Sequence, residues 1–321
     1  MALNQQDKHV KQDPLTDKTG EAMATAKAHL TVLLLILNWL CLAEAAFIIT
    51  GSTGVLGRRL VSACLSKRKA IVGLGYRDEG KLSELLASHS SDGRLLPFFL
   101  DLAKAENEVV FKTEEFFPKL LARMEGRDRN IVLINNAGVF LQGSSVQAMK
   151  NSLSINAIKP AKLAICLNDL VTKHNKSKPS DSQISLTIVN ISSGDGEVVY
   201  LSPAIQAQVS NLDTFNQWTW YLEYLLTTYN PQVEYGFGET PMYSLSKALL
   251  NSFTRIFHTK CAGQCRVLAV CPGDFESPMT TAAERGAAAD IDAVADLIVD
   301  MASNKNVQGG KFYRGGVEIQ M

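Results

Sequence analysis

The sequence predicts an α/β fold over residues 46–321, in which one doubly wound parallel sheet carries helices on both faces. Two observations predict this class. Short apolar runs alternate with segments whose apolar residues recur at helical spacing. Glycine or polar residues directly follow most of these runs. Because ligands bind at the carboxyl ends of the strands in such sheets, this order also predicts a binding site.

The predicted elements alternate along the chain as a parallel sheet requires. The predicted strands are Ala46–Thr50, Ala70–Leu74, Leu95–Leu100, Ile131–Ile134, Ser185–Ile191, Arg266–Val270 and Lys311–Tyr313. The predicted helices are one directly after Gly57, then Lys81–Ala87, Glu106–Arg123, a long helix from about Val146 to Val171, Ser202–Val209, Leu212–Leu226, one that begins near Pro241, and Ile291–Met301. The strands are short apolar runs, and the helical segments show the longer period.

The first 45 residues form an extension ahead of this domain. Residues 1–28 are polar, and residues 30–43 are apolar. The apolar run is short for a membrane span but fits a signal-peptide core, and Ala43-Glu44-Ala45 resembles a cleavage site. A membrane anchor, a signal peptide and a helix packed on the domain all stay open. We expect a cytoplasmic protein, with a membrane-anchored or secretory-pathway location as the alternative, which glycosylation at the Asn175 sequon would indicate.

The composition argues against nucleic acid as a partner and against a metal site. The 321 residues include 32 acidic and 32 basic ones, and no block of like charge stands out. The six cysteines are scattered without a Cys-x-x-Cys pair, so we expect neither a metal site nor a disulfide framework. Cys64, Cys166 and Cys271 lie in apolar runs and are predicted to be buried thiols.

A glycine-rich turn joins the first strand to the helix that follows. Gly51, Gly54 and Gly57 stand in this turn. The backbone amides of such a turn approach a pyrophosphate, and the start of the helix favours its negative charge. Arg77 follows the second strand, where the adenosine ribose lies in this fold, and no acid for the ribose of NAD stands at Tyr76. Since arginine suits the 2′-phosphate of NADP, the sequence favours NADP.

Residues of distinctive chemistry end five of the predicted strands. They are Gly51, Asp101, Asn135, Ser193 and Pro272. The carboxyl ends of parallel strands meet at one edge of the sheet, so we expect these residues to line one cleft.

Tyr243 and Lys247 lie four residues apart in a predicted helix. Pro241 suits the first helical turn, and Thr240 before it is predicted to cap the exposed amides. The two side chains then share one helix face, and a phenol beside an ammonium group can move a proton near neutral pH. The pair alone is weak evidence, because this spacing arises by chance in many helices.

A series of short motifs follows in a fixed order. The motifs are TGSTGVLG (50–57), Asp101-Leu102, NNAG (135–138), Asn156, NISS (190–193), YSLSK (243–247) and PGDFES (272–277). In this order and spacing they resemble the short-chain dehydrogenase/reductase family, which has a Rossmann-type fold. The resemblance covers about residues 46–315.

The interval from Ser193 to Tyr243 resembles one subgroup of that family, the monomeric carbonyl reductases that use NADPH. It is fifty positions long, and its extra segment, about residues 200–239, has helical character. In the subgroup this insertion covers the face that other members use to dimerise. The resemblance therefore implies a monomer.

Three positions depart from the family pattern. The family's glycine stands at the Val55 position, whereas here Gly54 comes one place early, so that a side chain crowds the approach of the pyrophosphate. A basic residue, which related NADPH enzymes often have at the Gly54 position, is missing, and this leaves Arg77 as the main support for NADP. Ser277 replaces a threonine that commonly binds the carboxamide, but the hydroxyl is retained.

The resemblance implies a mechanism for carbonyl reduction, with hydride from the nicotinamide. Tyr243 is the proton donor, and Ser193 donates a hydrogen bond to the carbonyl oxygen. Lys247 holds the ribose hydroxyls and lowers the tyrosine pKa, and Asn156 holds a water that relays protons to Lys247. The residues that the resemblance assigns to NADP(H) are Gly51, Ser52, Thr53, Gly54, Leu56, Gly57, Arg77, Asp101, Leu102, Asn136, Ala137, Gly138, Tyr243, Lys247, Pro272, Gly273 and Ser277.

The resemblance leaves the substrate open among aldehydes, ketones and quinones. The insertion residues Trp218, Trp220, Tyr221 and Tyr224 either line a pocket or pack the insertion on the core, and packing is the favoured interpretation. Two other functions compete. A membrane-associated retinol or steroid dehydrogenase is favoured by the apolar run at 30–43 and disfavoured by the long insertion. A non-catalytic NADP-binding scaffold typically lacks a catalytic residue, and none is missing here.

Overall fold

The computed structural model describes residues 45–321 apart from positions 69, 90–91, 125–128, 262 and 278–288. These residues belong to one compact unit, Glu44–Met321. The apolar run at residues 30–43 lies outside the described residues, and so does the proposed cleavage site apart from Ala45. Within the described part of the chain, no helix is long and apolar enough to cross a membrane.

Eight strands form one sheet in the order β3-β2-β1-β4-β5-β6-β7-β8. Their bounds are β1 Ala46–Thr50, β2 Ile71–Tyr76, β3 Leu95–Phe99, β4 Asn130–Asn135, β5 Ser185–Ile191, β6 Cys265–Cys271, β7 Lys311–Arg314 and β8 Val317–Ile319. The strands from β1 to β7 run parallel, and β8 pairs antiparallel with β7. The predicted parallel sheet is confirmed, while β8 is an addition. The chain order reverses between β1 and β4, which makes the carboxyl ends of these strands the natural place for a ligand.

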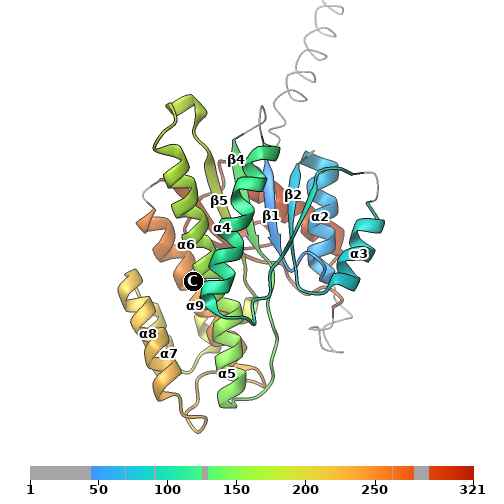
Figure 1. Ribbon diagram of the computed structural model, residues 1–321. Helices are drawn as coiled ribbons and strands as arrows, with labels where there is room; N and C mark the ends of the chain where they lie inside the picture. The colour runs from blue at the N-terminus through green and yellow to red at the C-terminus, as the bar shows by residue number, and fades with distance from the viewer. Residues whose placement is uncertain (1–44, 69, 90–91, 125–128, 262, 278–288) are drawn as a thin grey trace, which may run out of the picture. The chain divides into compact units, whose positions relative to one another are not determined.

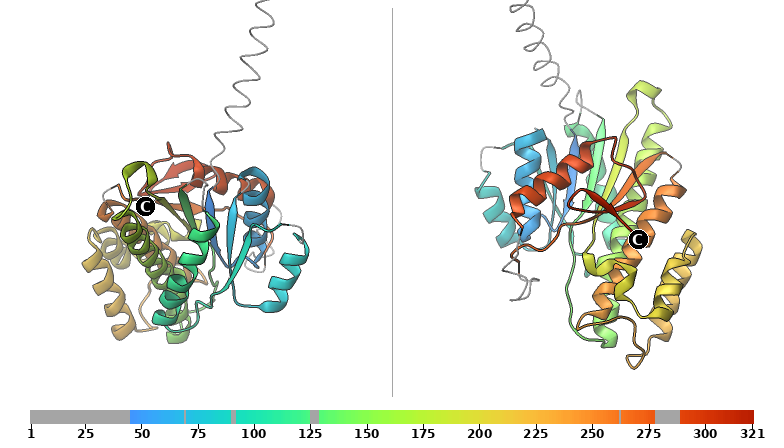
Figure 2. Two further views of the ribbon diagram at one scale, coloured as in Figure 1. Left: turned by 45° about the horizontal axis from the view of Figure 1, so that its top comes forward. Right: turned by 180° about the vertical axis from the view of Figure 1, so that it is seen from behind.

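Helices cover both faces of the sheet (Figures 1 and 2). Their bounds are α2 Val55–Arg68, α3 Glu79–Ala87, α4 Glu106–Arg123, α5 Val146–Leu153, α6 Lys159–Asn175, α9 Pro241–Lys260 and α10 Ile291–Ser303. Side chains of α4, α6 and α9 form the core on one face, and those of α2, α3 and α10 form the core on the other. β1 serves both cores because successive side chains point to opposite faces: Ile48 joins the first core, and Phe47 and Ile49 join the second.

The helix predicted from Val146 to Val171 is interrupted by a wider turn. α5 ends at Leu153, α6 begins at Lys159, and the π-helical turn Ser154–Ile158 joins them. Turns of this kind are rare and occur mostly at functional sites. This one carries the predicted site residue Asn156, which is buried within it.

The insertion forms two helices, α7 (Pro203–Ser210) and α8 (Phe215–Thr228), drawn in yellow beside α9 in Figure 1. Trp218 fastens α8 to α9, because its Nε1 donates a hydrogen bond to the carbonyl oxygen of Leu249 at 2.8 Å. Its ring also lies 5.2 Å from the ring of Phe253 on α9. The aromatic side chain thus supplies both the apolar contact and the polar partner that a buried tryptophan requires.

The packing interpretation of the insertion aromatics is confirmed for two of the four. Trp218 and Tyr221 are 3% and 2% exposed. It is wrong for Trp220 and Tyr224, which are 63% and 42% exposed. These two rings stack on each other at 5.6 Å on the outer side of α8, where the helix has no second layer to pack against among the described residues.

The five described cysteines are buried, including the three that the sequence predicts to be so. Burial raises the pKa of the Cys166 thiol to about 11, and the nearby carboxylates of Glu114 and Asp169 add to this effect. This thiol therefore stays protonated and unreactive near neutral pH.

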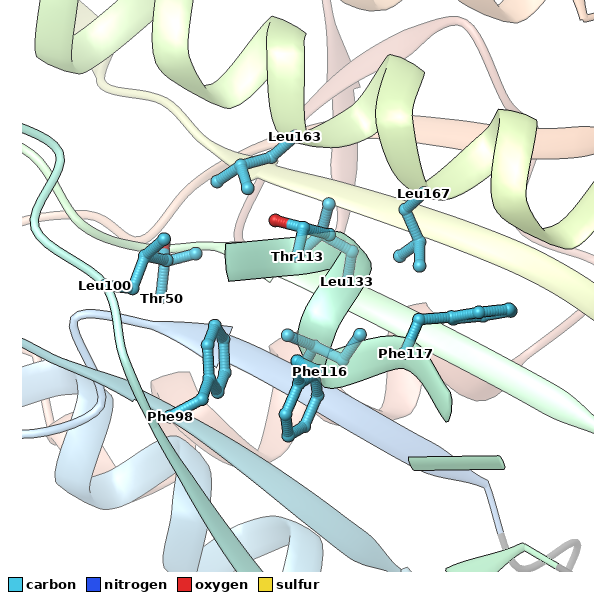
Figure 3. A pocket seen from close by; sticks show the side chains of 10 residues that line it. Thr50, Phe98, Leu100, Thr113, Phe116, Phe117, Leu133, Leu163 and Leu167 are labelled. Atoms are coloured by element: carbon cyan, nitrogen blue, oxygen red, sulfur yellow. The ribbon is translucent and has the colours of Figure 1, made fainter. Parts of the chain in front are cut away.

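A small apolar cavity lies between the sheet and the helices α4 and α6 (Figure 3). Its lining residues are Ile48, Thr50, Phe98, Leu100, Thr113, Phe116, Phe117, Leu133, Leu163 and Leu167. None of these side chains is ionisable, so the cavity offers no acid–base chemistry, and we interpret it as a gap in core packing.

Candidate active site

Thr50 ties the end of β1 to the end of β4. Its hydroxyl accepts hydrogen bonds from the backbone amides of Asn136 at 3.0 Å and Ala137 at 2.9 Å. In return, Asn136 Nδ2 donates to the carbonyl oxygens of Thr50 at 3.0 Å and Gly51 at 3.1 Å. The glycine turn and the segment after β4 therefore form one continuous rim. The side chain of Asn136, which was assigned to the cofactor, holds this rim together.

Glycine is required at two positions of the turn. Gly51 has a φ of 62°, and a Cβ atom there would lie 3.0 Å from Cα of Ala137. At Gly57 a Cβ atom would lie 2.2 Å from the carbonyl oxygen of Gly51. The turn is therefore closely packed against its neighbours. It leads directly into α2, whose first amides have no partner within the helix and attract negative charge.

Of two neighbours in the turn, Ser52 departs from the role that the resemblance implies, and Val55 does not. Ser52 is fully buried, and both its amide and its hydroxyl donate to the carbonyl oxygen of Gly75 at 3.1 Å. Its side chain therefore holds the turn against β2 instead of facing a ligand. Val55, the departure from the family pattern, is the first residue of α2, and it is 42% exposed. Its side chain thus stands beside the first amides of the helix, as the sequence suggests.

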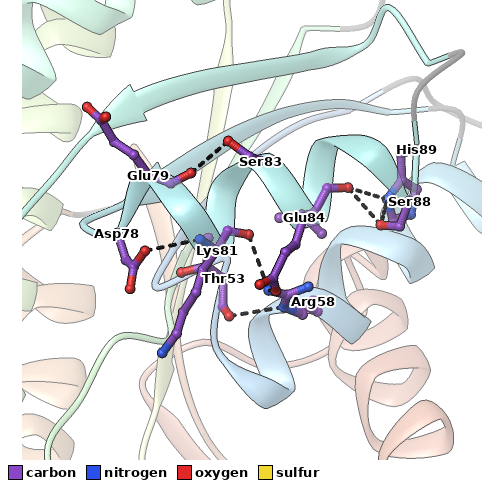
Figure 4. A network of polar contacts seen from close by, with 10 residues as sticks. Thr53, Arg58, Asp78, Glu79, Lys81, Ser83, Glu84, Ser88 and His89 are labelled. Atoms are coloured by element: carbon purple, nitrogen blue, oxygen red, sulfur yellow. Dashed lines mark hydrogen bonds and ion pairs between the residues drawn. The ribbon is translucent and has the colours of Figure 1, made fainter.

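A network of polar and charged side chains joins α2 to α3 (Figure 4). Arg58 donates from Nε to the carbonyl oxygen of Thr53 at 3.2 Å, and from Nη2 to Glu84 at 2.8 Å and to the carbonyl oxygen of Lys81 at 3.2 Å. Arg77, which is exposed, follows β2. Sequence reasoning identified Arg77 but missed Arg58. Its position in the first helical turn after the glycines was the available signal.

The acid next to Arg77 has a structural task. Asp78 is the N-cap of α3, and its Oδ1 accepts a hydrogen bond from the amide of Lys81 at 3.0 Å. Asp, together with Asn and Ser, is among the strongest N-cap residues because its carboxylate satisfies amides that have no partner within the helix. The Asp78 carboxylate is thus engaged at the start of α3, while Arg77 beside it is exposed.

The segment after β3 is fixed by a buried lysine. Lys159 is 3% exposed, and its Nζ donates hydrogen bonds to the carbonyl oxygens of Leu102, at 3.1 Å, and of Lys104. Asp101 accepts from the amide of Ala103 at 3.0 Å. The predicted Asp101-Leu102 pair therefore lies in a well-defined loop. Sequence reasoning missed Lys159, although a lysine within the apolar segment around Ile158 was a signal.

Lys247 is the central cation of the site. It lies on α9, is 5% exposed, and donates from Nζ to the carbonyl oxygen of Ile191 at 2.8 Å. Its Nζ is also 5.7 Å from the centre of the Tyr243 ring, so the predicted pairing on one helix face is present. Burial lowers the pKa of Lys247 to about 8, while the Cys271 thiol acts in the opposite direction.

Tyr243 and Ser193 meet at the end of β5. The tyrosine is 9% exposed, and its hydroxyl lies close enough to the Ser193 side chain for that side chain to affect its pKa. Burial raises the pKa of Tyr243, the Ser193 side chain opposes this effect, and the charge of Asp195 adds to it. The expectation that Lys247 lowers this pKa is therefore not met by the protein's own groups. The lysine hydrogen bonds to a backbone carbonyl, and desolvation of the phenolate is the larger effect.

Asn156 is buried in the site and is not a surface residue, being 1% exposed. Its Oδ1 accepts from the amide of Val139 at 2.8 Å, and its Nδ2 donates to the carbonyl oxygen of Val139 at 2.9 Å and to Ser246 Oγ at 3.0 Å. A Cβ atom at Gly138 would lie 3.2 Å from Asn156 Oδ1 and 3.7 Å from Lys247 Nζ. The structure thus brings the predicted residues Asn156, Gly138 and Lys247 together.

Three predicted cofactor residues follow β6. Pro272, Gly273 and Ser277 are half-buried, and Gly273 has a φ of 73°. The amide of Gly273 donates to Cys271 Sγ at 3.4 Å, which holds the start of this segment. The three residues lie at the carboxyl end of the strand, as the strand-end argument predicts.

Phe140 is a site residue that the sequence did not indicate. Its ring centre lies 4.9 Å from that of Tyr243, with an interplanar angle of 73°. Such edge-to-face pairs are favourable beyond their buried area. Phe140 is half-buried, so part of its ring remains open beside the tyrosine. Only the fold brings the segment after β4 to this helix, and no local pattern signals the contact.

Thr240 departs from its prediction. It is the N-cap residue of α9, as expected, but its side chain forms no capping hydrogen bond. The first turn is instead closed by a backbone bond from the amide of Ser244 to the carbonyl oxygen of Thr240 at 3.1 Å. Pro241 stands in the first turn, as predicted, where its missing amide costs nothing.

No family model matches the chain, and no curated protein matches it. Solved structures do. Salutaridine reductase from Papaver somniferum is 21% identical, with a TM-score of 0.66 over 84% of this chain and 99% of that one. The NADPH-bound carbonyl reductase from chicken fatty liver is 20% identical, with a TM-score of 0.63 over 87% and 99%. The carbonyl reductase Sniffer of D. melanogaster is 18% identical, with a TM-score of 0.58 over 85% and 97%. The chain has the fold of these reductases, which confirms at that level its resemblance to the short-chain dehydrogenases/reductases and to carbonyl reductases among them.

Proposed function

We propose that the protein is an NADPH-dependent reductase that converts the carbonyl of an aldehyde, ketone or quinone to an alcohol. The observation that carries the proposal is the Tyr243–Ser193 pair. The two hydroxyls meet at the end of β5, beside the buried Lys247 and next to a glycine turn of phosphate-binding form. The solved structures that share the fold include carbonyl reductases, which supports the same activity.

The site residues have different roles in the proposed reaction. Bound NADPH supplies the hydride. Ser193 donates a hydrogen bond to the substrate oxygen, and Tyr243 gives it a proton. Because burial raises the pKa of Tyr243, the phenol holds its proton at neutral pH and suits the direction of reduction. Asn156 joins Val139 to Ser246, which in turn donates to the carbonyl oxygen of Tyr243 at 2.7 Å, and so positions the start of α9.

The residues at the other end of the cleft fit NADP better than NAD. The glycine turn has no room for side chains at Gly51 and Gly57, which allows a pyrophosphate close to the backbone. Arg77 is exposed after β2, and the carboxylate of Asp78 caps α3. Arg58, whose Nε donates to the carbonyl oxygen of Thr53, lies near the turn as a second guanidinium, although its Nη2 pairs with Glu84. Two guanidinium groups suit a 2′-phosphate.

We also propose that the protein acts as a monomer with one catalytic domain after the N-terminal extension. α8 packs on α9 through Trp218, so the insertion covers the helix face that would otherwise be open. For location we favour the cytoplasm. Asn175 exchanges two hydrogen bonds of 2.8 Å with the backbone of Ile184, and a glycan on its Nδ2 would break them. Fractionation of cells that express the full chain tests this location.

An assay of the full-length protein with NADPH and NADH tests the function. The substrate panel contains small and bulky aldehydes, ketones and quinones. We expect turnover of at least one carbonyl class, with NADPH preferred about tenfold or more because of the two arginines. Tight NADPH binding without turnover over the panel would support the scaffold function instead. Turnover only of alcohols with NADP⁺ would support the alcohol dehydrogenase.

A further inference from the structure

We propose that Tyr229 of the insertion controls substrate discrimination, because it holds the loop on which Phe140 faces Tyr243. The loop, residues 136–145, connects β4 to α5 and is called the β4–α5 loop below. This inference rests on the proposed reductase function. It assigns Tyr229 a positioning role and Phe140 a specificity-determining one.

The insertion is bonded to the far end of the β4–α5 loop at two points. Tyr229 Oη donates a hydrogen bond to the carbonyl oxygen of Ser144 at 2.5 Å. The amide of Gly143 donates to the carbonyl oxygen of Glu239 at 2.9 Å. Gly143 has a φ of 78°, so the loop turns sharply at this point through a conformation that suits glycine. The insertion therefore does more than cover α9.

The near end of the same loop is held by the catalytic machinery. Val139 exchanges two hydrogen bonds with the Asn156 side chain, at 2.8 and 2.9 Å. Phe140 is the next residue, and its ring meets that of Tyr243 edge to face. A residue fixed between two anchors shifts when either anchor is released. The position of the Phe140 ring beside the tyrosine thus depends on Tyr229.

Tyr229 is itself firmly placed. It is the C-cap residue of α8, and its ring stacks on that of Tyr235 at 4.8 Å. Tyr235 is 7% exposed, and its hydroxyl accepts from the amide of Asn230 at 3.2 Å. Burial raises the pKa of Tyr229, so its hydroxyl remains a donor throughout the neutral range. α8 is anchored on α9 by Trp218, and this completes a rigid path from the catalytic helix to the loop.

The chemistry of Phe140 defines what it selects. The ring is apolar and lies against the proton donor, so it contacts the group that flanks the substrate carbonyl. A fixed ring limits the size of that group, and a released ring admits a larger one. Hydrophobic pockets discriminate by volume in this way, with modest factors for each group.

The test compares Tyr229→Phe with Tyr221→Phe as a matched control. Both changes remove one hydroxyl from the insertion. Tyr221 Oη, however, donates to Gln208 Oε1 at 2.8 Å, within the insertion itself. For each variant, kcat/KM is measured with NADPH for a small aldehyde, propanal, and a bulky ketone, benzophenone. We expect the benzophenone-to-propanal ratio to rise about fivefold in Tyr229→Phe, the effect of one hydrogen bond, and to stay unchanged in Tyr221→Phe.

A third variant tests whether the effect passes through Phe140. In Phe140→Ala the benzophenone-to-propanal ratio rises because the wall is removed. Adding Tyr229→Phe to this variant is then expected to change the ratio no further. Full additivity of the two changes would overturn the role assigned to Phe140.

Hydrogen exchange separates this inference from the proposed function. In Tyr229→Phe the amides of residues 141–145 should exchange faster, whereas Tyr221→Phe leaves them unchanged. If no carbonyl is reduced by any form of the protein, the reductase proposal fails while the exchange result still tests the loop contact. Equal exchange and equal substrate ratios in the wild type and Tyr229→Phe would overturn the inference. The same holds if Tyr221→Phe matches the effect of Tyr229→Phe.

Discussion

The two ends of the proposed cofactor cleft differ in how far their charged side chains are buried. At the catalytic end, Lys247 is 5% exposed and bonded to a backbone carbonyl. At the adenosine end, Arg77 is exposed and the Arg58 side chain is 32% exposed. A buried charge carries a desolvation cost and a fixed geometry, while an exposed charge is screened by salt. Changes at the first end should therefore affect chemistry and stability together, and changes at the second should affect cofactor choice alone.

Lys247→Met gives the largest effect in this comparison. We expect kcat to fall on the order of a thousandfold, since the buried ammonium is lost from the site. The free energy of unfolding should not fall. At pH 7 wild-type Lys247 is charged, and its pKa of about 8 against an ordinary 10.5 means that folding disfavours this form. After loss of one hydrogen bond is deducted, the variant should be more stable by about 2 kcal/mol, as measured by urea denaturation.

The difference in the free energy of unfolding between Lys247→Met and the wild type should depend on pH. The folded state loses the Lys247 proton near pH 8, whereas the unfolded state keeps it up to about 10.5. Between these values the unfolded state binds more protons, so the lysine's contribution to stability rises with pH. The stability advantage of Lys247→Met should therefore shrink from pH 7 to pH 9.5. An advantage that is constant across this range would show that the ammonium is not desolvated.

The same titration should appear in the activity of the wild type. Above pH 8 the ammonium of Lys247 is lost, so kcat/KM for carbonyl reduction should fall by up to about tenfold for each pH unit. A pH profile from 6 to 10 with saturating NADPH measures this effect. A profile that stays flat through this range would mean that the lysine charge is not needed.

Arg77→Ala should act on the cofactor and leave the chemistry intact. We expect the KM for NADPH to rise about tenfold, with kcat and the KM for NADH unchanged, and the effect should weaken at high salt. Arg58→Ala should show the same pattern at about threefold. Arg59→Ala is the matched control, because Arg59 follows Arg58 directly but pairs with Asp292 on α10 at 3.4 Å. A change of the same size in the control would contradict a local role for the other two.

The fold could be predicted where local pattern and tertiary structure agree. β1 and β5 begin and end at the predicted residues, because each is rich in apolar residues and almost entirely buried. β8 carries no such signal, since Val317–Ile319 is short and lies mostly exposed at the sheet edge. The π-helical turn at Ser154–Ile158 was also hidden, because one wider turn hardly alters the apolar spacing of a long helix.

The site residues, like the elements of the fold, could be predicted only where the signal lies in the local sequence. Ser193, Tyr243 and Lys247 could be found because their spacing and strand-end positions are properties of the chain. Their pKa values could not, because desolvation depends on what surrounds them. Phe140 and Tyr229 were missed for a related reason: their contacts join segments that only folding brings together. The capping hydrogen bond predicted for Thr240 is wrong. A threonine at the N-cap forms this bond only when its rotamer and its neighbours allow it.

The central claim is that Tyr243 donates the proton in carbonyl reduction, and Tyr243→Phe tests it most directly. The variant keeps the ring that packs against Phe140 and loses only the hydroxyl beside Ser193. Urea denaturation serves as the folding control and should show one cooperative unfolding transition, as in the wild type. The account predicts that kcat for the best carbonyl substrate falls on the order of a thousandfold. Reduction at near wild-type rates would contradict it.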